Sequence, residues 1–395
     1  MTSALALLAF ALFLLVPSAG IIEKYLGLPG VCAYWIIGGL LLWMIMRPGS
    51  WAMRLTLRLK PRVALALLML TFVVLIATFF IIYPIANTGL IGGGSDGDEA
   101  VNLGVQALWQ GQYPYYATTY LDNPVVTLGG GLLLSTPSVW LGNSAYQSLF
   151  WLLLFVLALH LRLRDRRLTL LLFWLMLFLA PLTFYDIITG GDRTANTLAV
   201  LVSIQWLLVA ARHGQRRAIV AAVLVGLSLA WRFNFLLLLP LIAVAIWRST
   251  TPRYALLLNG IILLVIAATI VPFYVIDPAG FAPLRTGLKL LWPGAAVVIT
   301  ALTGGLAVLL ALRQPRQCRV GRLFRNSALV LAVPIWSMVI LVTVLYGSGL
   351  YFAGYGIFAL YFAVASFGVD LLRRANPQSV LAAPAPASPA LETPA

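Results

Sequence analysis

The feature that most constrains this chain is the recurrence of long apolar stretches along almost its whole length. Stretches such as 63–86, 254–275 and 327–346 run for about 20 residues, the length that a helix needs to cross about 30 Å of hydrocarbon. Hydrophobic residues make up 62% of the 395 residues, and charged residues only 9%. A soluble domain of this size could not bury so much apolar surface. The sequence therefore predicts an all-α, polytopic membrane protein.

The apolar pattern and the basic turns together predict a topology. We expect twelve transmembrane helices, at 3–22, 30–46, 63–86, 144–161, 168–185, 195–211, 218–231, 234–247, 254–275, 294–312, 327–346 and 350–370. With these spans, all but five of the 26 Lys and Arg residues fall on one side. The positive-inside rule makes that side cytoplasmic. The prediction is a multi-pass protein of the plasma (inner) membrane with both termini in the cytoplasm.

One apolar segment, 125–142, is left out of the spans because counting it would invert every later loop. Its glycines and Pro137 also weaken a helix. We interpret it as an interfacial or re-entrant piece of an external loop, 87–143, that also carries interfacial helices. Three regions result: two N-terminal helices with a basic loop (1–62), a transmembrane catalytic region (63–374), and a disordered, Ala- and Pro-rich cytoplasmic tail (375–395).

Other composition features exclude functions. The net charge of +15 could suggest nucleic acid, but the basic residues form short clusters between apolar spans, as topology signals do. Cys32 and Cys318 lie near different spans, which argues against a disulfide and against a metal site. We expect no nucleic-acid partner and no resident cofactor. The expected partners are membrane lipids and lipid-linked substrates.

The first external loop holds the most informative cluster of charges. Residues 87–124 contain four carboxylates and no Lys or Arg, and three of the carboxylates, Asp96, Asp98 and Glu99, stand just before a predicted helix. One interpretation is helix capping, because carboxylates are favoured at helix N-termini. The other is that crowded carboxylates raise one another's pKa, which suits a general base or a metal ligand. A divalent metal at Asp96 and Asp98 is the less favoured alternative.

The predicted helix carries its own pattern. From Glu99 to Gln110 the spacing places Val101, Val105 and Leu108 on one stripe, which indicates a helix lying at the membrane surface.

The order of motifs in this loop resembles the first external loop of GT-C glycosyltransferases. The motifs are Asp98-Glu99, a short helix, Gly111-Gln112-Tyr113-Pro114-Tyr115, then Asn123-Pro124 and an apolar segment that ends near Gly142. The chain is most similar to the polyprenyl-phosphate-dependent mannosyltransferases of glycosyltransferase family 87. That resemblance implies that an acidic residue of the loop is the catalytic base, here Asp98, with Asp96 and Glu99 as rivals.

Two further segments carry the resemblance, which covers about residues 63–370. Residues 226–240, GLSLAWRFNFLLLLP, match a Gly-rich helix, a basic residue and a Leu-rich helix with Pro. Gly190-Gly191 with Asn196 is a looser match, and Asp192-Arg193 departs from the usual neutral pair. The resemblance implies inversion at the sugar's anomeric carbon and no nucleotide-sugar site.

Arg232 stands out from the residues alone. The helices on either side of it are about 14 residues long, so the turn with Arg232 and Asn234 is predicted to lie below the outer surface. A cation there costs on the order of 3 kcal/mol unless it is paired or hydrated. It either snorkels to the interface or binds a lipid-linked phosphate, which suits the two-pronged guanidinium.

Further residues of the external side complete the predicted substrate site. Arg285 and Lys289, four residues apart, and Arg193 are the other candidate phosphate cations, while headgroup contact is the alternative for the first two. Tyr113 and Tyr115 are the aromatic residues that we would expect first to stack on a sugar. The full predicted substrate-binding set is Arg232, Arg285, Lys289, Arg193, Asp192, Tyr113, Tyr115, Asn123 and Asn234.

The resulting prediction is an inverting membrane glycosyltransferase. It would move a mannose-like hexose or a pentose from a polyprenyl phosphate to a lipid or glycan acceptor on the extracytoplasmic face. A transporter or flippase of a lipid-linked sugar is the alternative, although such proteins usually place carboxylates or broken helices near the midplane. A non-catalytic scaffold is a third possibility, for which three clustered carboxylates have no evident use.

Overall fold

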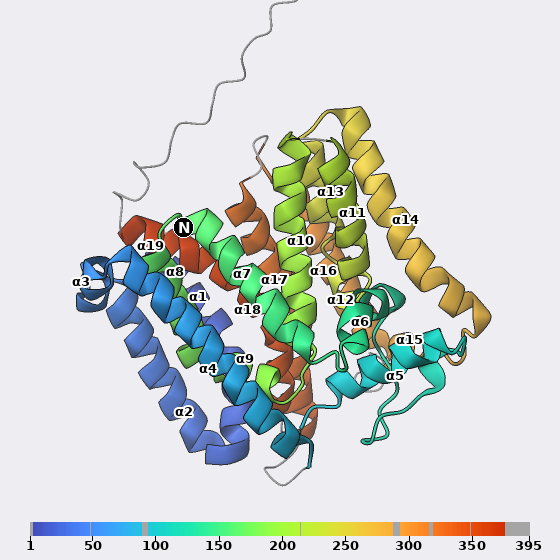
Figure 1. The fold of residues 1–395 in the computed structure, drawn as a ribbon, viewed down its shortest axis with the longest axis horizontal. Coiled ribbons are helices and arrows are strands. Elements are labelled where there is room, and N and C mark those ends of the chain that lie inside the picture. Colours follow the sequence, from blue (N-terminus) through green and yellow to red (C-terminus); the bar gives the residue numbers. More distant parts are fainter. Residues whose placement is uncertain are drawn as a thin grey trace, which may run out of the picture.

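The computed structural model is a bundle of helices (Figure 1). It describes residues 3–47, 49–88, 94–213, 215–286, 293–315, 319–347 and 349–375. Within these ranges the chain forms no strand, and the one isolated bridge pairs Thr118 with Pro124. The structure confirms the predicted all-α class.

In chain order the α-helices are α1 (Ser3–Leu15), α2 (Ala19–Met46), α3 (Trp51–Arg58), α4 (Pro61–Asn87), α5 (Gly97–Trp109), α6 (Gly129–Trp140), α7 (Tyr146–Leu163), α8 (Arg166–Leu179), α9 (Pro181–Ile188), α10 (Arg193–His213), α11 (Gln215–Leu229), α12 (Phe233–Leu236), α13 (Leu239–Trp247), α14 (Pro252–Ile276), α15 (Ala282–Thr286), α16 (Pro293–Leu312), α17 (Val320–Tyr346), α18 (Ile357–Ala363) and α19 (Val369–Ala375). Short 3₁₀ or π turns lie at Val16–Ser18, Pro114–Tyr116, Leu350–Gly356 and Val364–Gly368.

The apolar helices make this a multi-pass membrane protein. In the part of the chain that the structure describes, eight helical stretches are long and apolar enough to cross a membrane, or nine if one bent pair counts as a span. The number twelve is therefore not confirmed. The difference arises where predicted spans are merged, bent or short, and the remaining predicted positions coincide with long helices.

The first two predicted spans form one continuous apolar stretch, Ala4–Met46. Gly27 interrupts its helical geometry with a φ of +65°, and Pro29 follows within the same helix. Gly38 packs directly against the side chain of Leu15, so the segments before and after this break lie side by side. Glycine supplies the left-handed conformation that such a reversal needs.

Three more predicted spans fall short of a straight crossing. α8 and α9 are bent by 80° around Pro181, which has no N–H to continue a helix. α11 has 15 residues, and α12 with α13 forms only a short apolar segment, Phe233–Trp247. At 1.5 Å per residue, a helix of 15 residues is shorter than the hydrocarbon layer.

The segment left out of the predicted spans forms α6, which is buried in protein. Its glycines Gly129, Gly130 and Gly131 are buried, and the helix contacts α5, α11 and α14. A Cβ at Gly130 would lie 2.5 Å from the carbonyl oxygen of Leu227, so only glycine allows this approach. α6 is therefore too short to span and packs against other helices, as we predicted for a re-entrant piece.

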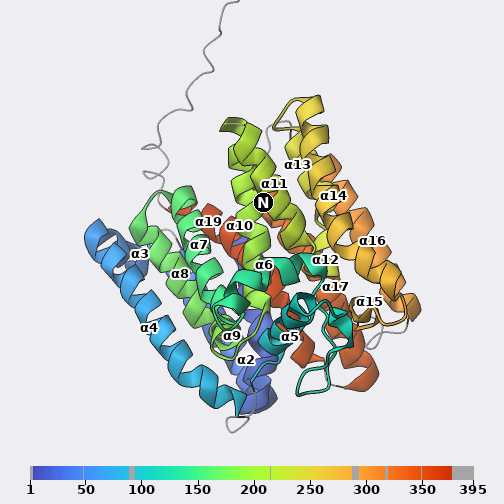
Figure 2. The same cartoon turned by 45° about the vertical axis from the view of Figure 1, so that its right-hand side comes forward.

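The two ends of the bundle carry different turns and short helices. The α10–α11 and α13–α14 turns lie at one end, and α5, α9 and α15 lie at the other (Figures 1 and 2). The second end carries the carboxylates of the predicted site. At the C-terminus, α19 includes Ala375, the residue at which we expected the tail to begin; the rest of that predicted tail, 376–395, is outside the described residues.

Candidate functional site

The predicted helix of the first loop exists as α5, and its position brings the carboxylates together with residues from four other segments. The hydroxyl of Ser95 accepts a hydrogen bond from the Gly97 N–H at 3.1 Å, whereas the Asp96 side chain, at the N-cap position, makes no capping bond. Asp96 therefore does not serve as the cap that one interpretation required.

The apolar stripe of α5 packs on protein. Val101 and Val105 are fully buried and form a cluster with Leu132 and Val139 of α6, with Leu108 packed against it. The stripe therefore faces α6 and not lipid, while the position of α5 at the membrane surface stays a prediction. The same hydrophobic spacing serves either environment, and here α6 supplies the apolar partner.

Asp98 is the buried carboxylate of the three, with 5% of its surface exposed. Burial raises its pKa to about 6, and hydrogen bonds from the Tyr83 hydroxyl, from nearby backbone N–H groups and from Asn143 partly offset this rise. The cause is desolvation, not the repulsion between neighbouring carboxylates that we predicted. A carboxylate with such a pKa is suited to take up a proton near neutral pH.

The two rival carboxylates turn toward their own partners. Asp96 Oδ2 accepts hydrogen bonds from the Thr119 hydroxyl and from Asn123 Nδ2, both at 2.8 Å. Glu99 accepts one from the Tyr120 N–H at 3.0 Å. These bonds fasten the loop after α5 to the start of the helix. Asn123, predicted to bind substrate, here bonds a carboxylate of its own loop.

A chain of hydrogen bonds that sequence reasoning missed leads to Asp98. The Tyr83 hydroxyl of α4 donates to Asp98 Oδ2, and Asn143 Nδ2 donates to that hydroxyl. Asn102 Nδ2 donates to Asn143 Oδ1 at 3.1 Å, and the Ser144 hydroxyl donates to the backbone carbonyl of Asp98 at 3.0 Å. The sequence contains one indication of this chain of hydrogen bonds: the amide side chains Asn102 and Asn143 stand within or beside apolar segments.

The loop from Thr189 to Asp192 lies against the start of α5. The Ser95 N–H donates to the Thr189 carbonyl at 3.0 Å, and the Asp98 N–H donates to the Gly190 carbonyl at 3.1 Å. At Gly97, a Cβ would lie 3.2 Å from Asp192 Oδ1. The segment with Gly190 and Gly191 thus brings Asp192 against Gly97, the residue before Asp98.

Gly190 should not tolerate a side chain. Its φ is +78°, and a Cβ would lie 2.7 Å from both Asp98 Oδ1 and the Tyr83 ring. Gly190→Ala is expected to destabilise the protein by about 1–3 kcal/mol and to displace Asp98. The measurement is the melting temperature in detergent beside that of Gly260→Ala, a helical glycine with open space around it. An equal melting temperature for both variants would contradict this expectation.

Arg232 is paired, which corrects its prediction as an open phosphate-binding cation. One guanidinium nitrogen donates to both oxygens of Asp192, at 2.7 and 2.6 Å, and Arg232 also lies over the Phe358 ring at 6.0 Å. Arg232 Nε, Asn234 Nδ2 and Trp231 Nε1 are buried without a hydrogen-bond acceptor in the described part of the chain. Buried donors normally have acceptors, so this turn can offer hydrogen bonds to a bound anion.

Arg193 is also paired, with a fully buried carboxylate. Its Nε donates to Asp186 Oδ1 at 3.0 Å, and the Thr194 N–H donates to Asp186 Oδ2 at 2.8 Å. The guanidinium lies over the Tyr355 ring at 5.7 Å. These contacts join α9, α10 and the Leu350–Gly356 turn. Arg193, predicted as a phosphate cation, is therefore engaged in holding three segments together.

The predicted sugar-stacking tyrosines are used in packing. Tyr115 is 4% exposed and meets the rings of Phe273 and Phe281 edge to face. Tyr113 donates from its hydroxyl to the backbone carbonyls of Phe273 and Asp277, at 2.9 and 3.2 Å. Tyr115 has no ring face open to a sugar, so a stacking role there is not supported. These rings fix the loop after α5 to the end of α14.

Two predicted cations are not resolved by the described geometry. α15 includes Arg285, but its side chain, and Lys289 altogether, lie outside the described residues. Their expected contact with phosphate stays a prediction.

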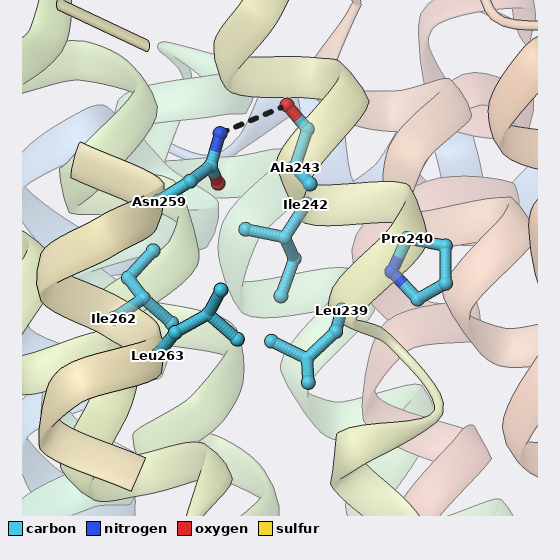
Figure 3. A pocket seen from close by; sticks show the side chains of 7 residues that line it. All are labelled: Leu239, Pro240, Ile242, Ala243, Asn259, Ile262 and Leu263. Atoms are coloured by element: carbon cyan, nitrogen blue, oxygen red, sulfur yellow. Dashed lines mark hydrogen bonds between the residues drawn. The ribbon is translucent and has the colours of Figure 1, made fainter. Parts of the chain in front are cut away.

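An apolar groove lies between α13 and α14 (Figure 3). It has a volume of about 190 Å³, and Leu239, Pro240, Ile242, Ile262 and Leu263 line it. Asn259, also at the groove, turns its Nδ2 to the Ala243 carbonyl at 3.5 Å. The groove begins only a few residues after Arg232 in the chain and offers apolar contacts alone.

Within the described ranges, no group of three or more His, Cys, Asp and Glu side chains is placed to hold a metal ion. Asp96 and Asp98 bond different partners, and a divalent ion held by both stays an alternative predicted from the sequence alone. Comparisons with protein-family models, with curated proteins and with solved structures give no match to this chain.

Proposed function

We propose that the protein is a membrane glycosyltransferase that moves a sugar from a polyprenyl phosphate to a lipid or glycan hydroxyl on the extracytoplasmic face. Asp98 takes the proton from the acceptor hydroxyl as its oxygen attacks the anomeric carbon. The bond from that carbon to the phosphate oxygen breaks, and the polyprenyl phosphate leaves. The sugar inverts at this carbon.

The observation that carries the proposal is the environment of Asp98. It is a buried carboxylate with a pKa raised to about 6, held in place by Tyr83 and by the Asn143 chain of hydrogen bonds. A general base works best when its pKa lies near the operating pH. A carboxylate whose pKa is raised by burial and that is held by a specific hydrogen-bond donor is a candidate for a chemical role.

The Asp192–Arg232 pair supports the second half of the reaction. Asp192 lies against Gly97, the residue before Asp98, and the turn around Arg232 holds buried donors that lack acceptors within the described residues. Negative charge grows on the leaving phosphate as the sugar becomes oxocarbenium-like. Fixed donors and a cation at that position would stabilise the transition state more than the ground state.

The second candidate function is a transporter or flippase of a lipid-linked sugar. Two ion pairs, Asp192–Arg232 and Asp186–Arg193, have three of their four members within residues 186–193, and paired ionisable residues within membrane proteins often mark transport pathways. A carrier of this kind would move the lipid or sugar and form no glycosidic bond.

The discriminating experiment uses the purified full chain in liposomes with a set of radiolabelled polyprenyl-phosphate sugars and a membrane glycolipid extract. A labelled glycolipid or glycan that requires the protein supports glycosyl transfer. Movement of label between leaflets without a new glycosidic bond would replace the proposal with the transporter.

The topology can be tested with cysteines that the structure places on the surface. In a background with Cys32→Ser and Cys318→Ser, Tyr120→Cys is expected to react with a membrane-impermeant maleimide added to intact cells. Arg253→Cys, in a basic turn at the other end of the bundle, is expected to react only after lysis. The reverse pattern would place Asp98 on the cytoplasmic side and remove the extracytoplasmic reaction.

A further inference from the structure

The strongest unassigned feature near the site is the contact between Tyr83 and Asp98. Tyr83 stands near the end of α4, fifteen residues before Asp98, and belongs to no motif that the resemblance covers. Its hydroxyl donates to Asp98 Oδ2, while Asp98 Oδ1 lies over Gly190. A hydroxyl that donates to a carboxylate stabilises the ionised form, the form in which the group can accept a proton.

Tyr83 is itself held in place. Asn143 Nδ2 donates to its hydroxyl, and the Asn143 side-chain oxygen accepts from Asn102 Nδ2 and from the Ala145 N–H, at 3.1 and 2.9 Å. Its ring stacks on Phe79 with the centroids 4.9 Å apart. The Tyr83 hydroxyl therefore accepts a hydrogen bond from Asn143, which is itself held in place, and donates its proton to Asp98 Oδ2. This is the arrangement of a side chain that sets the position of another.

We propose that Tyr83 is the positioning residue of Asp98, which orients the carboxylate through Oδ2 and keeps it ionised at neutral pH. The inference rests on the proposed function only in assigning Asp98 as the base; the contact itself does not depend on the reaction. Tyr83 makes no new bond and loses no proton in the step. Its role is to hold Asp98 ready to accept the proton of the acceptor hydroxyl.

Several other charged and titratable groups lie near Asp98. They are Asp96 and Glu99 at the start of α5, Tyr120 in the loop after α5, and Asp192 with its partner Arg232. Neither these carboxylates nor Arg232 is among the causes of the raised pKa of Asp98, which comes from burial. Of the hydrogen bonds to Asp98 that lower its pKa, the one from the Tyr83 hydroxyl contributes most, ahead of those from backbone N–H groups and from Asn143.

The test measures Asp98 without any substrate. The carboxyl stretching band of Asp98, identified by its loss in Asp98→Asn, is titrated by infrared difference spectroscopy in the full chain in detergent. In the wild type we expect a midpoint near pH 6. In Tyr83→Phe the midpoint should rise by about one pH unit, because a donor that lowers the pKa is gone.

The matched control is Tyr146→Phe. Tyr146 meets the same Phe79 ring edge to face, at 6.0 Å between centroids, and has no contact with Asp98 among the described hydrogen bonds. Its midpoint should equal that of the wild type. If Tyr83→Phe does not fold, Asn143→Ala provides the second variant, with a smaller upward shift. An unchanged midpoint in the Tyr83 and Asn143 variants would overturn the proposal.

The activity measurement separates this inference from the proposed function. The acid limb of the pH profile of transfer should move upward with the infrared midpoint in Tyr83→Phe, whereas a purely structural role would lower the rate at every pH. A shifted midpoint in a protein that forms no glycosidic bond would leave Tyr83 as the positioning residue of Asp98 and refute the glycosyltransferase alone.

Discussion

Replacing Asp98 with Asn is expected to lower the rate of glycosyl transfer by about 10²–10⁴-fold, the usual contribution of a general base. Asn has nearly the same shape and can remain next to Gly190, but it cannot accept the proton of an acceptor hydroxyl. The measurement is kcat/KM for transfer from a polyprenyl-phosphate sugar by the purified variant. Turnover at the wild-type rate would exclude Asp98 as the base.

The wild-type enzyme should show the corresponding pH dependence. Asp98 must be ionised to act, and its pKa is raised to about 6, so the rate should rise with pH up to and through 6 and then level off. In Asp98→Asn the residual rate should lack this limb. Asp96→Asn and Glu99→Gln are the matched controls, because they lie within two residues of Asp98 and bond other partners. Both should keep the limb.

Loss of activity in Asp98→Asn should not come from unfolding. The pKa of Asp98 is higher in the folded protein than in the unfolded chain, so the protonated carboxyl group favours folding at a pH below its pKa in the unfolded chain. That contribution is lost as the pH rises through about 6. At pH 7 the wild type therefore already carries the cost of an ionised, buried Asp98. The neutral Asn avoids this cost, so we expect a melting temperature at pH 7 no lower than that of the wild type.

The sequence predicted those features that depend on local pattern. Apolar length located most of the long helices, and helical spacing located α5 to within a few residues. The presence of three glycines and Pro137 correctly indicated that residues 125–142 do not cross the membrane as a straight helix. These features follow from the chemistry of consecutive residues, so a single sequence contains them.

The sequence could not predict the pairing of side chains that meet only in the folded bundle. Arg232 and Asp192 are 40 residues apart, and Tyr113 meets α14 from 160 residues away. No periodicity links such positions, so the sequence alone shows neither the partner of Arg232 nor the packing of the Tyr115 ring. Whether a valine stripe covers lipid or another helix is equally a property of its neighbours, so the spacing within α5 does not reveal that α6 covers its stripe.

The second large effect is expected at the Asp192–Arg232 pair. Arg232 is 20% exposed and Asp192 only 5%, so either charge left alone would lie in a poorly hydrated site. Removing one partner of a buried pair typically costs about 3–5 kcal/mol. Asp192→Asn and Arg232→Gln should each destabilise the protein by an amount of that order, measured as the free energy of unfolding in detergent.

The double variant Asp192→Asn, Arg232→Gln tests the cause. It leaves no unpaired charge, so it should be far less destabilised than the sum of the single variants. Additive effects at positions 192 and 232 would show that the two side chains do not interact in the folded protein.

Measurements of activity should show whether Arg232 has a role of its own, even where the stabilities of the Asp192 and Arg232 variants are equal. If the guanidinium holds the leaving phosphate, Arg232→Lys keeps a charge but loses the fork that reaches two oxygens at once, and kcat should fall. The double variant, although folded, should then be inactive, because stability returns without the cation. A folded and fully active double variant would mean that the pair only stabilises the bundle, and the phosphate would have to be bound elsewhere at this end of the molecule.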